Sequence, residues 1–440
     1  MGGDMTTAPD RLGDQAVVPL RTLDPDAPLD DLAHLDRAIG DARVVAIGES
    51  AHYNAESYRL RHRLLRYLVE RHGFTAYAME TGACEAWLVD DWVRGGAQPV
   101  GRVLAEGLTS LMGSWTQMRE HLEWMRRHNA AASTPVGFYG IDLGCANASL
   151  LPALDVVLDH LARAEPESPV SPALRATAAT FPATSAFAIP QALAAYGQLP
   201  VERRDALTAG LAELAARLRA GSLDHVRRTG AEDYERALRA MANTVTLDVV
   251  LRGMARGDLR SAALHRDTTI AETVEWVLGR ERRVVLAAHN GHIQRQPVTM
   301  PGAAAPVTTM GMRLADRLGR DYLVIGTTTA TGRTLGPGFF AGELFERLPP
   351  PEPGSLDALM AASHDGPFTT DLRTLSSRDA EAVRAASRQR YGTYYAEVDP
   401  LDAYDLLVHL PYVTEATPDP DALTASPEEV RAAVAAWQAR

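Results

Sequence analysis

The stretch VVAIGESAHYNAE, residues 44–56, decides how the chain is interpreted. Its first part, VVAI, has the length and composition of a buried strand, and the run ends at Gly48. Glu49, Ser50 and His52 follow almost together. Because two ionisable groups at the mouth of a buried strand are costly unless something satisfies or uses them, this stretch predicts a functional site at a strand end.

Outward from this stretch, apolar runs alternate with helical patterns. The runs predict strands at 42–49, 74–80, 136–142, 283–290, 322–327 and within 402–411. The patterns between them predict helices at 54–73, 82–96, 115–129, 265–279 and 312–319. This alternation indicates an α/β fold with a largely parallel sheet covered by helices.

The strand signal vanishes over residues 148–263, which are rich in Ala and Leu. We expect this region to be an inserted or appended all-helical part that forms a cleft. The expected organisation is therefore an N-terminal extension (1–40), a first part of the α/β core (41–147), the helical insert (148–263), and a second part of the core with the C-terminal segment (264–440).

Composition restricts the partners. The net charge of −12 argues against nucleic acid, whose binding requires a basic surface. All 44 basic residues are Arg, which removes Schiff-base chemistry and the phosphate-binding lysine of Walker-type loops. The first residues lack the pattern of a secretory signal, and no apolar run has the roughly 18 residues of a membrane span. We expect a cytoplasmic protein that acts on a small molecule, without nucleic acid or membrane.

Acids and histidines gather at the ends of four predicted strands. They are Glu49 and His52 after the first, Glu80 and Asp142 at the ends of the second and third, and His289 and His292 at the end of the fourth. In open α/β sheets, ligands bind beyond the carboxyl ends of the strands, so these side chains form a site hypothesis.

Each residue also has a structural explanation. Glu49 and Glu80 could stabilise the start of the helix that follows each of them. Asp142 could bond backbone amides in its turn, as a short acid in a strand-to-helix turn readily does. His289 is harder to explain structurally, because burying an imidazole in a strand costs free energy unless its ring nitrogens are hydrogen-bonded.

The residues allow general acid–base hydrolysis. His52 would take a proton from water, and Glu49 or Glu80 would orient its ring. Arg61, on the helix after the first strand, would stabilise the oxyanion together with His289.

Two other chemistries stay open. GESAH differs from the nucleophile elbow G-x-S-x-G only at its last position, and Ser50, Asp142 and His289 follow the order of the hydrolase triad. However, His52 would crowd the tight crossing that the final Gly allows. A metal site could use histidines and carboxylates from the same strand ends, but the chain has no HExxH and no thiolate cluster.

Seven segments together resemble the erythromycin esterase family in order and spacing. They are GESAHYNAE, AYAMETG, WTQMREHLEWMRRHN, FYGIDLG, HRDTTIAETVEW, LAAHNGHIQRQPV and TMGMRLADRLGRDYLVIGT. The resemblance runs from about residue 40 to about residue 330, and the joint order of the segments is more specific than any one of them.

The resemblance implies hydrolysis of a macrolide lactone by water activated on a histidine, with no metal and no cofactor. It also implies an α/β core with an inserted helical part. By position, the family's active-site residues correspond to His52, Glu49, Arg61, Glu80 and His289. Neighbouring residues are expected to bind substrate, namely Tyr53, Arg59, Asn290 and His292.

The chain departs from the family pattern near the site. Ala51 stands where Thr is frequent, Tyr53 where Gly is common, and Ile270 where Met is more usual. These departures affect the expected substrate more than the chemistry. A biosynthetic lyase, cyclase or epimerase could use the same His and Glu pair, and a non-catalytic binder of a large apolar metabolite is a further alternative.

Overall fold

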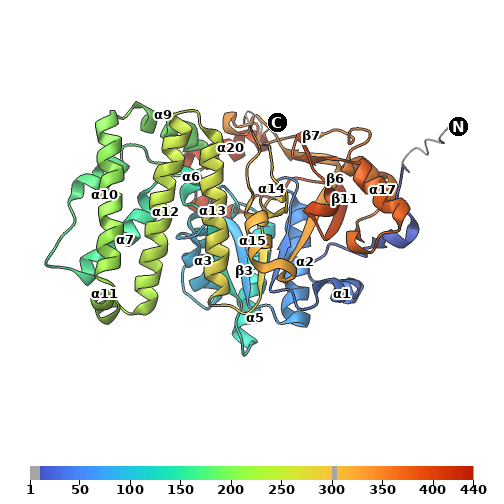
Figure 1. Cartoon of the computed structure of the whole chain (residues 1–440), viewed down its shortest axis with the longest axis horizontal. Coiled ribbons are helices and arrows are strands. Elements are labelled where there is room, and N and C mark those ends of the chain that lie inside the picture. Colours follow the sequence, from blue (N-terminus) through green and yellow to red (C-terminus); the bar gives the residue numbers. More distant parts are fainter. Residues whose placement is uncertain (1–9, 300–304, 440) are drawn as a thin grey trace. The chain divides into compact units, whose positions relative to one another are not determined.

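The computed structural model describes residues 10–299 and 305–439 (Figure 1). Its strands are β1 (Val18–Pro19), β2 (Val44–Ile47), β3 (Ala76–Gly82), β4 (Gly137–Asp142), β5 (Val284–Ala287), β6 (Tyr322–Leu335), β7 (Phe345–Leu348), β8 (Phe368–Asp371), β9 (Arg388–Tyr391), β10 (Tyr394–Glu397) and β11 (Leu406–Val413). Within the described residues, nine of them form one sheet in the order β1-β8-β11-β6-β2-β5-β3-β4, with β7 paired to β6. β9 and β10 form a separate hairpin.

The centre of the sheet is parallel, as the sequence predicts. β2 pairs in parallel with β5 on one side and β6 on the other, and β11 is parallel to β6. The edge formed by β1 and β8 is antiparallel, as is the pairing of β7 with β6. All four residues of β2 are fully buried, which is why this strand reads as an uninterrupted apolar run. The expected α/β fold class is confirmed.

Two compact units divide the chain. Unit 1 comprises Met1–Ala78, Trp115–Gly137 and Glu275–Pro418, and unit 2 comprises Met79–Ser114, Phe138–Val274 and Asp419–Arg440. The helices of unit 1 are α1 (Asp36–Ile39), α2 (Ala55–His72), α5 (Thr116–Ala131), α14 (Asn290–Ile293), α15 (Met310–Leu318), α16 (Leu356–Ser363), α17 (Ser377–Ala385) and α18 (Pro400–Ala403). α2 ends at His72 and is capped by Gly73, which has a φ of 65° and donates its N–H to the carbonyl of Val69.

Unit 2 is mainly helical. Its helices are α3 (Ala86–Val93), α4 (Val100–Gly107), α6 (Cys145–Ala148), α7 (Leu151–Ala164), α8 (Pro172–Ala178), α9 (Ile189–Gln198), α10 (Val201–Ala220), α11 (Ser222–Thr229), α12 (Ala231–Ala255), α19 (Pro420–Ala425) and α20 (Glu428–Gln438). α13 (Leu259–Leu278) crosses from unit 2 into unit 1. Residues 148–263 contain only helices and their connections, as the Ala- and Leu-rich sequence predicts.

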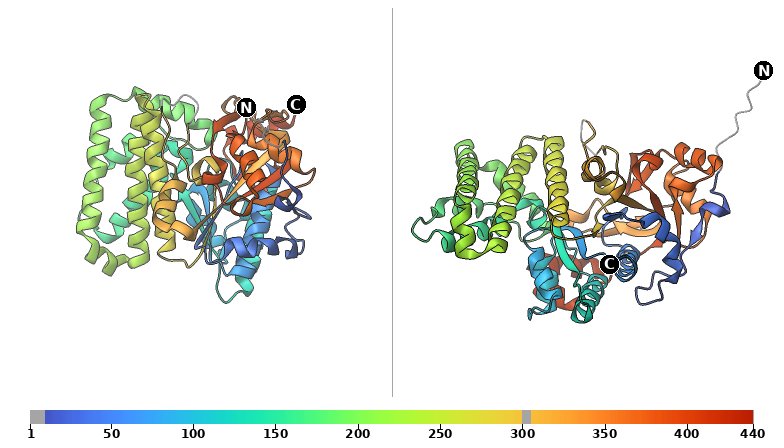
Figure 2. Two further views of the ribbon diagram at one scale, coloured as in Figure 1. Left: turned by 45° about the vertical axis from the view of Figure 1, so that its right-hand side comes forward. Right: turned by 60° about the horizontal axis from the view of Figure 1, so that its bottom comes forward.

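The long helices α7, α10 and α12 pack side by side in unit 2 (Figures 1 and 2). Buried Leu154 of α7, Leu211 of α10 and Leu247 of α12 belong to one hydrophobic cluster that joins them. The same unit holds an open cavity of about 630 Å³, which is lined by parts of 104–111, 149–152, 182–185 and 425–430. No helix in the described ranges is both long and apolar enough to cross a membrane.

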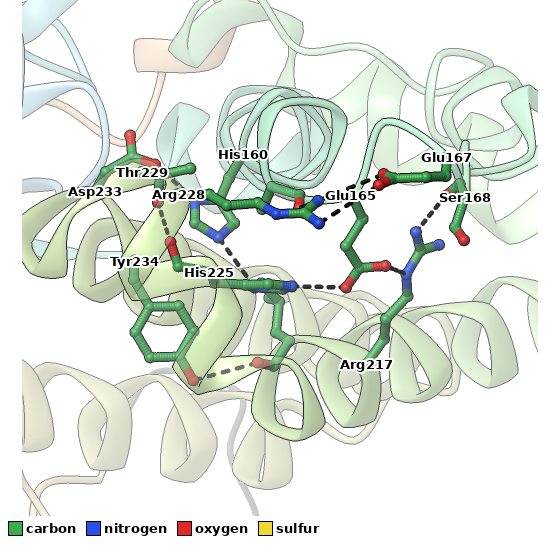
Figure 3. Close-up of polar contacts among 12 residues, drawn as sticks. His160, Glu165, Glu167, Ser168, Arg217, His225, Arg228, Thr229, Asp233 and Tyr234 are labelled. Carbon is green, nitrogen blue, oxygen red and sulfur yellow. Dashed lines mark hydrogen bonds and ion pairs between the residues drawn. The ribbon is translucent and has the colours of Figure 1, made fainter.

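A polar network crosses the helices of unit 2 (Figure 3). The buried ring of His160 donates from Nδ1 to Asp233 at 2.6 Å, and its Nε2 lies 3.2 Å from Nδ1 of His225. His225, also buried, donates from Nε2 to Glu165 at 2.6 Å. The other oxygen of Glu165 accepts from Nε of Arg217 at 2.5 Å. Each buried imidazole is therefore paired with a carboxylate, which satisfies groups that are otherwise costly inside a helical bundle.

We predict that Glu165→Gln destabilises unit 2 by about 1.5–3 kcal/mol at pH 7. Burial raises the pKa of Glu165, but hydrogen bonds from His225 and Arg217 outweigh this effect and lower it below its ordinary value. Because the pKa is lower in the folded state, this contribution is present above the unfolded pKa of about 4.3 and is lost as the pH falls.

Urea unfolding followed by circular dichroism at pH 7 and pH 3.5 measures the difference. The gap between wild type and Glu165→Gln should shrink at the lower pH. Glu213→Gln, at an exposed position on α10, is the matched control and should stay within about 0.5 kcal/mol of wild type. An equal gap at both pH values would contradict the assignment.

Candidate active site

The register of the parallel strands β2 and β5 brings two site residues to one edge of the sheet. Ile47 lies opposite Ala287, so Glu49 and His289, each two residues further on, leave the sheet side by side. The backbone keeps this register beyond the strands, because the N–H of Asn290 donates to the carbonyl of Glu49 at 2.9 Å. The strand-end rule thus correctly brings these two residues together.

Glu49 is the centre of the arrangement. Its Oε1 accepts from Nδ1 of His52 at 2.6 Å, and its Oε2 lies 2.9 Å from Nη1 of Arg61. Glu49 and Arg61 are almost wholly buried, whereas the His52 side chain is 24% exposed. A carboxylate only accepts hydrogen bonds, so Glu49 holds the proton of His52 on Nδ1 and makes Nε2 the nitrogen that can accept a proton.

Arg61 is directed into the protein. Besides its ion pair with Glu49, Nη2 donates to the carbonyl of Ala288 at 2.8 Å and is 3.5 Å from that of Ile47. The guanidinium therefore ties the end of α2 nearest the site to the ends of both strands. This placement fits a residue that positions Glu49, and a contact of Arg61 with an oxyanion stays a prediction.

Gly48 and Asn290 hold the segments that follow β2 and β5 close together. A Cβ at Gly48 would lie 2.0 Å from Oδ1 of Asn290, so only glycine fits the close approach. Asn290 is fully buried, donates to the carbonyl of Thr327 at 2.8 Å and accepts from the N–H of the same residue at 3.1 Å. Both ends of its amide are thus engaged with β6, and substrate contact by Asn290 stays a prediction.

The sequence predicts His289 within a strand at 283–290, but the observed strand is shorter and His289 lies after it. β5 ends at Ala287, and His289 is the N-cap of the short helix α14. Its Nδ1 accepts from the N–H of Gly291 at 3.0 Å, so Nε2 carries the proton and donates to the carbonyl of Ser50 at 3.1 Å. The ring centroid is 5.5 Å from that of His52. The two imidazoles are neighbours.

The β9–β10 hairpin contacts the same place and was not predicted from the sequence. The ring of Tyr391 meets the ring of His289 edge-on at 5.1 Å, and the N–H of Gly392 donates to the carbonyl of Ser50 at 2.6 Å. A local signal was present, because Gly392 and Thr393 form a two-residue connection between aromatic residues. Its contact with the site depends on tertiary packing, which no local pattern shows.

The side chain of Ser50 is not part of a triad within unit 1. Its Oγ is buried and donates to Oγ1 of Thr329 at 3.5 Å. His289 receives the Gly291 N–H on one ring nitrogen and donates to the backbone of Ser50 from the other. The geometry therefore lacks the hydroxyl-to-imidazole bond that an activated serine requires.

Glu80 and Asp142 meet in unit 2 at an arginine that the sequence analysis did not select. Arg266 of α13 donates to Asp142 through Nε at 2.9 Å and Nη2 at 2.5 Å, and also to Glu80 at 3.0 Å. Burial alone would lower the pKa of Arg266, but Asp142 and then Glu80 raise it above its ordinary value. Asp142 thus has a structural partner, and the role of Glu80 in catalysis stays a prediction.

Three further predicted substrate-binding residues lie in different settings. Tyr53 is buried next to His52, with ring centroids 5.7 Å apart. Arg59 is exposed on α2, on the side opposite Arg61, and lines a separate cavity of about 650 Å³ together with Asp24 and Glu120. His292 is part-buried on α14, where its N–H donates to the carbonyl of His289. Substrate binding by each stays a prediction.

Within residues 10–299 and 305–439, no group of three or more His, Cys, Asp or Glu side chains is arranged to hold a metal ion.

Comparison with known proteins gives the family. A model of the family described as erythromycin esterase matches residues 69–413. The chain belongs to the erythromycin esterase family. Erythromycin esterase type II of Escherichia coli is 31% identical over 329 residues, which cover 72% of this chain and 76% of the relative. Erythromycin esterase type I of Escherichia coli is 28% identical over 307 residues, which cover 67% and 71%.

Two solved structures share the fold. A solved structure of a mutant erythromycin esterase in its open conformation matches with a TM-score of 0.72 at 21% identity, covering 90% of this chain and 97% of that one. A Bacillus cereus protein matches with a TM-score of 0.76 at 19% identity, covering 92% and 97%. Membership of the erythromycin esterase family supports an ester hydrolase acting on a small molecule.

In this erythromycin esterase family member, we predict that Arg61→Met lowers the free energy of unfolding by about 3–5 kcal/mol, because it leaves the buried carboxylate of Glu49 without its cation. The double variant Glu49→Gln with Arg61→Met should recover part of the loss, since no buried charge remains.

Denaturant unfolding measures both variants. Arg59→Met is the matched control, because it changes an exposed arginine two residues away, and it should alter stability by no more than about 0.5 kcal/mol. Equal effects of the two arginine substitutions would contradict the buried ion pair.

Proposed function

We propose that this protein hydrolyses the ester bond of a macrolide lactone, with His52 as the general base that activates water. The supporting observation is the 2.6 Å bond between Glu49 and Nδ1 of His52. A buried acceptor fixes the imidazole tautomer, and Nε2 is the nitrogen able to accept a proton. The names of the relatives supply the substrate class, because both are described as erythromycin esterases.

The reaction begins with transfer of a water proton to Nε2 of His52 as the water oxygen attacks the ester carbonyl carbon. The resulting imidazolium is stabilised by the adjacent carboxylate of Glu49. The tetrahedral intermediate then breaks its bond to the alkoxy oxygen, which takes the proton from His52. The products are a carboxylic acid and an alcohol on the opened ring, so one water is added overall.

Charge on the carbonyl oxygen requires a hydrogen-bond donor. His289 carries its proton on Nε2, according to the bonds that both ring nitrogens make. We propose that substrate takes over this N–H from the carbonyl of Ser50, so that His289 stabilises the oxyanion. Arg61 acts indirectly, because it holds the carboxylate of Glu49 in place. The buried Glu49 in turn sets the orientation of the His52 ring.

His52→Ala is expected to lower kcat for erythromycin by about 10²- to 10⁴-fold while leaving the fold intact, because it removes the base. Mass spectrometry detects the reaction as the gain of one water. His364→Ala is the control, since that imidazole bonds Gly366 in its own turn. Unchanged turnover in His52→Ala would exclude His52 as the base.

Ser50→Ala is expected to retain substantial turnover, because the Ser50 hydroxyl bonds Thr329 and no imidazole activates it. Steady-state kinetics with erythromycin and intact-protein mass spectrometry test this together. A folded Ser50→Ala protein without turnover, combined with a wild-type protein that accumulates an acyl adduct, would replace water activation with an acyl-enzyme mechanism.

A further inference from the structure

The residue after His52 has an unusual backbone conformation. Tyr53 has a φ of 64°, in the left-handed region that glycine adopts most readily. A bulky residue in this region is strained and persists only when the surroundings hold it in place. The Tyr53 ring is buried between aromatic neighbours, with centroids 5.5 Å from Trp115 and 6.0 Å from Phe339, the latter stacked. These contacts hold a side chain where a glycine would leave an opening.

The aromatic contacts continue to the surface of unit 1. Phe339 lies in the connection between β6 and β7 and is buried, and its ring meets that of Phe340 edge-on at 5.3 Å. Phe340 is 55% exposed. Consecutive ring contacts of 5.3–6.0 Å thus run from His52 through Tyr53 and Phe339 to an exposed phenyl ring. Trp115 contacts Tyr53 in this row and is itself packed against Phe345 at 5.8 Å.

We propose that Phe340, supported by Phe339 and Tyr53, is a specificity-determining residue that binds the apolar face of a macrocyclic substrate while its ester lies at His52. The proposal rests on the function proposed above and adds the part of the substrate that is recognised. A macrocyclic lactone presents a large hydrocarbon surface. An exposed aromatic ring that is linked to His52 by three successive ring contacts offers apolar contact area at a low cost in side-chain entropy. Tyr53 and Phe339 are buried and packed against each other, so the ring that Phe340 contacts is held in place.

Binding, measured separately from turnover, tests the proposal. His52→Ala serves as the background, because bound erythromycin is then not consumed, and equilibrium dialysis gives its Kd. Phe340→Ala in this background should raise the Kd about three- to tenfold, as expected for the loss of one aromatic contact. Phe340→Tyr should restore tight binding, because it keeps the ring.

Leu223→Ala is the control, since Leu223 is also a large exposed apolar residue and lies on α11 of unit 2. It should not change the Kd. Thermal unfolding of each variant checks that the exposed substitutions leave the fold intact.

The outcomes separate the two proposals. Erythromycin that binds in a Phe340-dependent way but is not hydrolysed by wild type supports the aromatic contact and overturns the proposed reaction. Hydrolysis by wild type with a Kd that Phe340→Ala does not change overturns the aromatic contact and leaves the reaction standing. Absence of measurable binding also overturns the contact, as does an equal rise in Kd with Leu223→Ala.

Discussion

The buried carboxylate of Glu49 is the constraint on which the rest of unit 1's site depends. A charge in this position is tolerated because Arg61 neutralises it and His52 donates to it, at 2.9 and 2.6 Å. The same two bonds fix the helix that carries Arg61 and the ring that faces solvent. The buried Glu49 carboxylate thereby determines which ring nitrogen of the partly exposed His52 carries the proton. This determination links the fold to the proposed chemistry.

The register of β2 and β5 places His289 close to the segment that carries Glu49. Because Ile47 and Ala287 are paired, the segments after β2 and β5 run side by side, and His289 reaches the carbonyl of Ser50. Gly48 permits the close approach of Asn290, whose amide then fastens both segments to β6. The segments after β2 and β5 are thus held to each other and to the middle of β6. The rings of the two histidines are oriented by their own hydrogen bonds.

The sequence predicts those features of the fold and of the candidate site that depend on neighbouring residues in the chain. Glu49, His52 and Arg61 lie within one strand–helix segment, and the parallel fold follows from the alternation of apolar runs with helical patterns. What it missed depends on contacts between distant segments. The hairpin that places Tyr391 on His289 lies about a hundred residues away in sequence, and nothing local relates the two.

Arg266 shows the same limit in unit 2. Its segment carries part of the family resemblance, but its pairing with Asp142 and Glu80 becomes visible only in three dimensions. The predicted end of the strand before His289 was also wrong, because His289 is the N-cap of α14 and does not end a strand. Boundaries of this kind are decided by a few hydrogen bonds and are poorly encoded in local pattern.

The tautomer of His52 is the most direct test of the central claim that Glu49 prepares this ring to accept a proton. Nitrogen-15 NMR of the histidine side chains, with the His52 signals assigned from their loss in His52→Ala, reports which ring nitrogen carries the proton in the neutral form. We predict a proton on Nδ1 and an unprotonated Nε2 in wild type, with that preference weakened in Glu49→Gln. A neutral ring protonated on Nε2 in wild type would contradict it, because the nitrogen assigned to take the proton of water would already hold one.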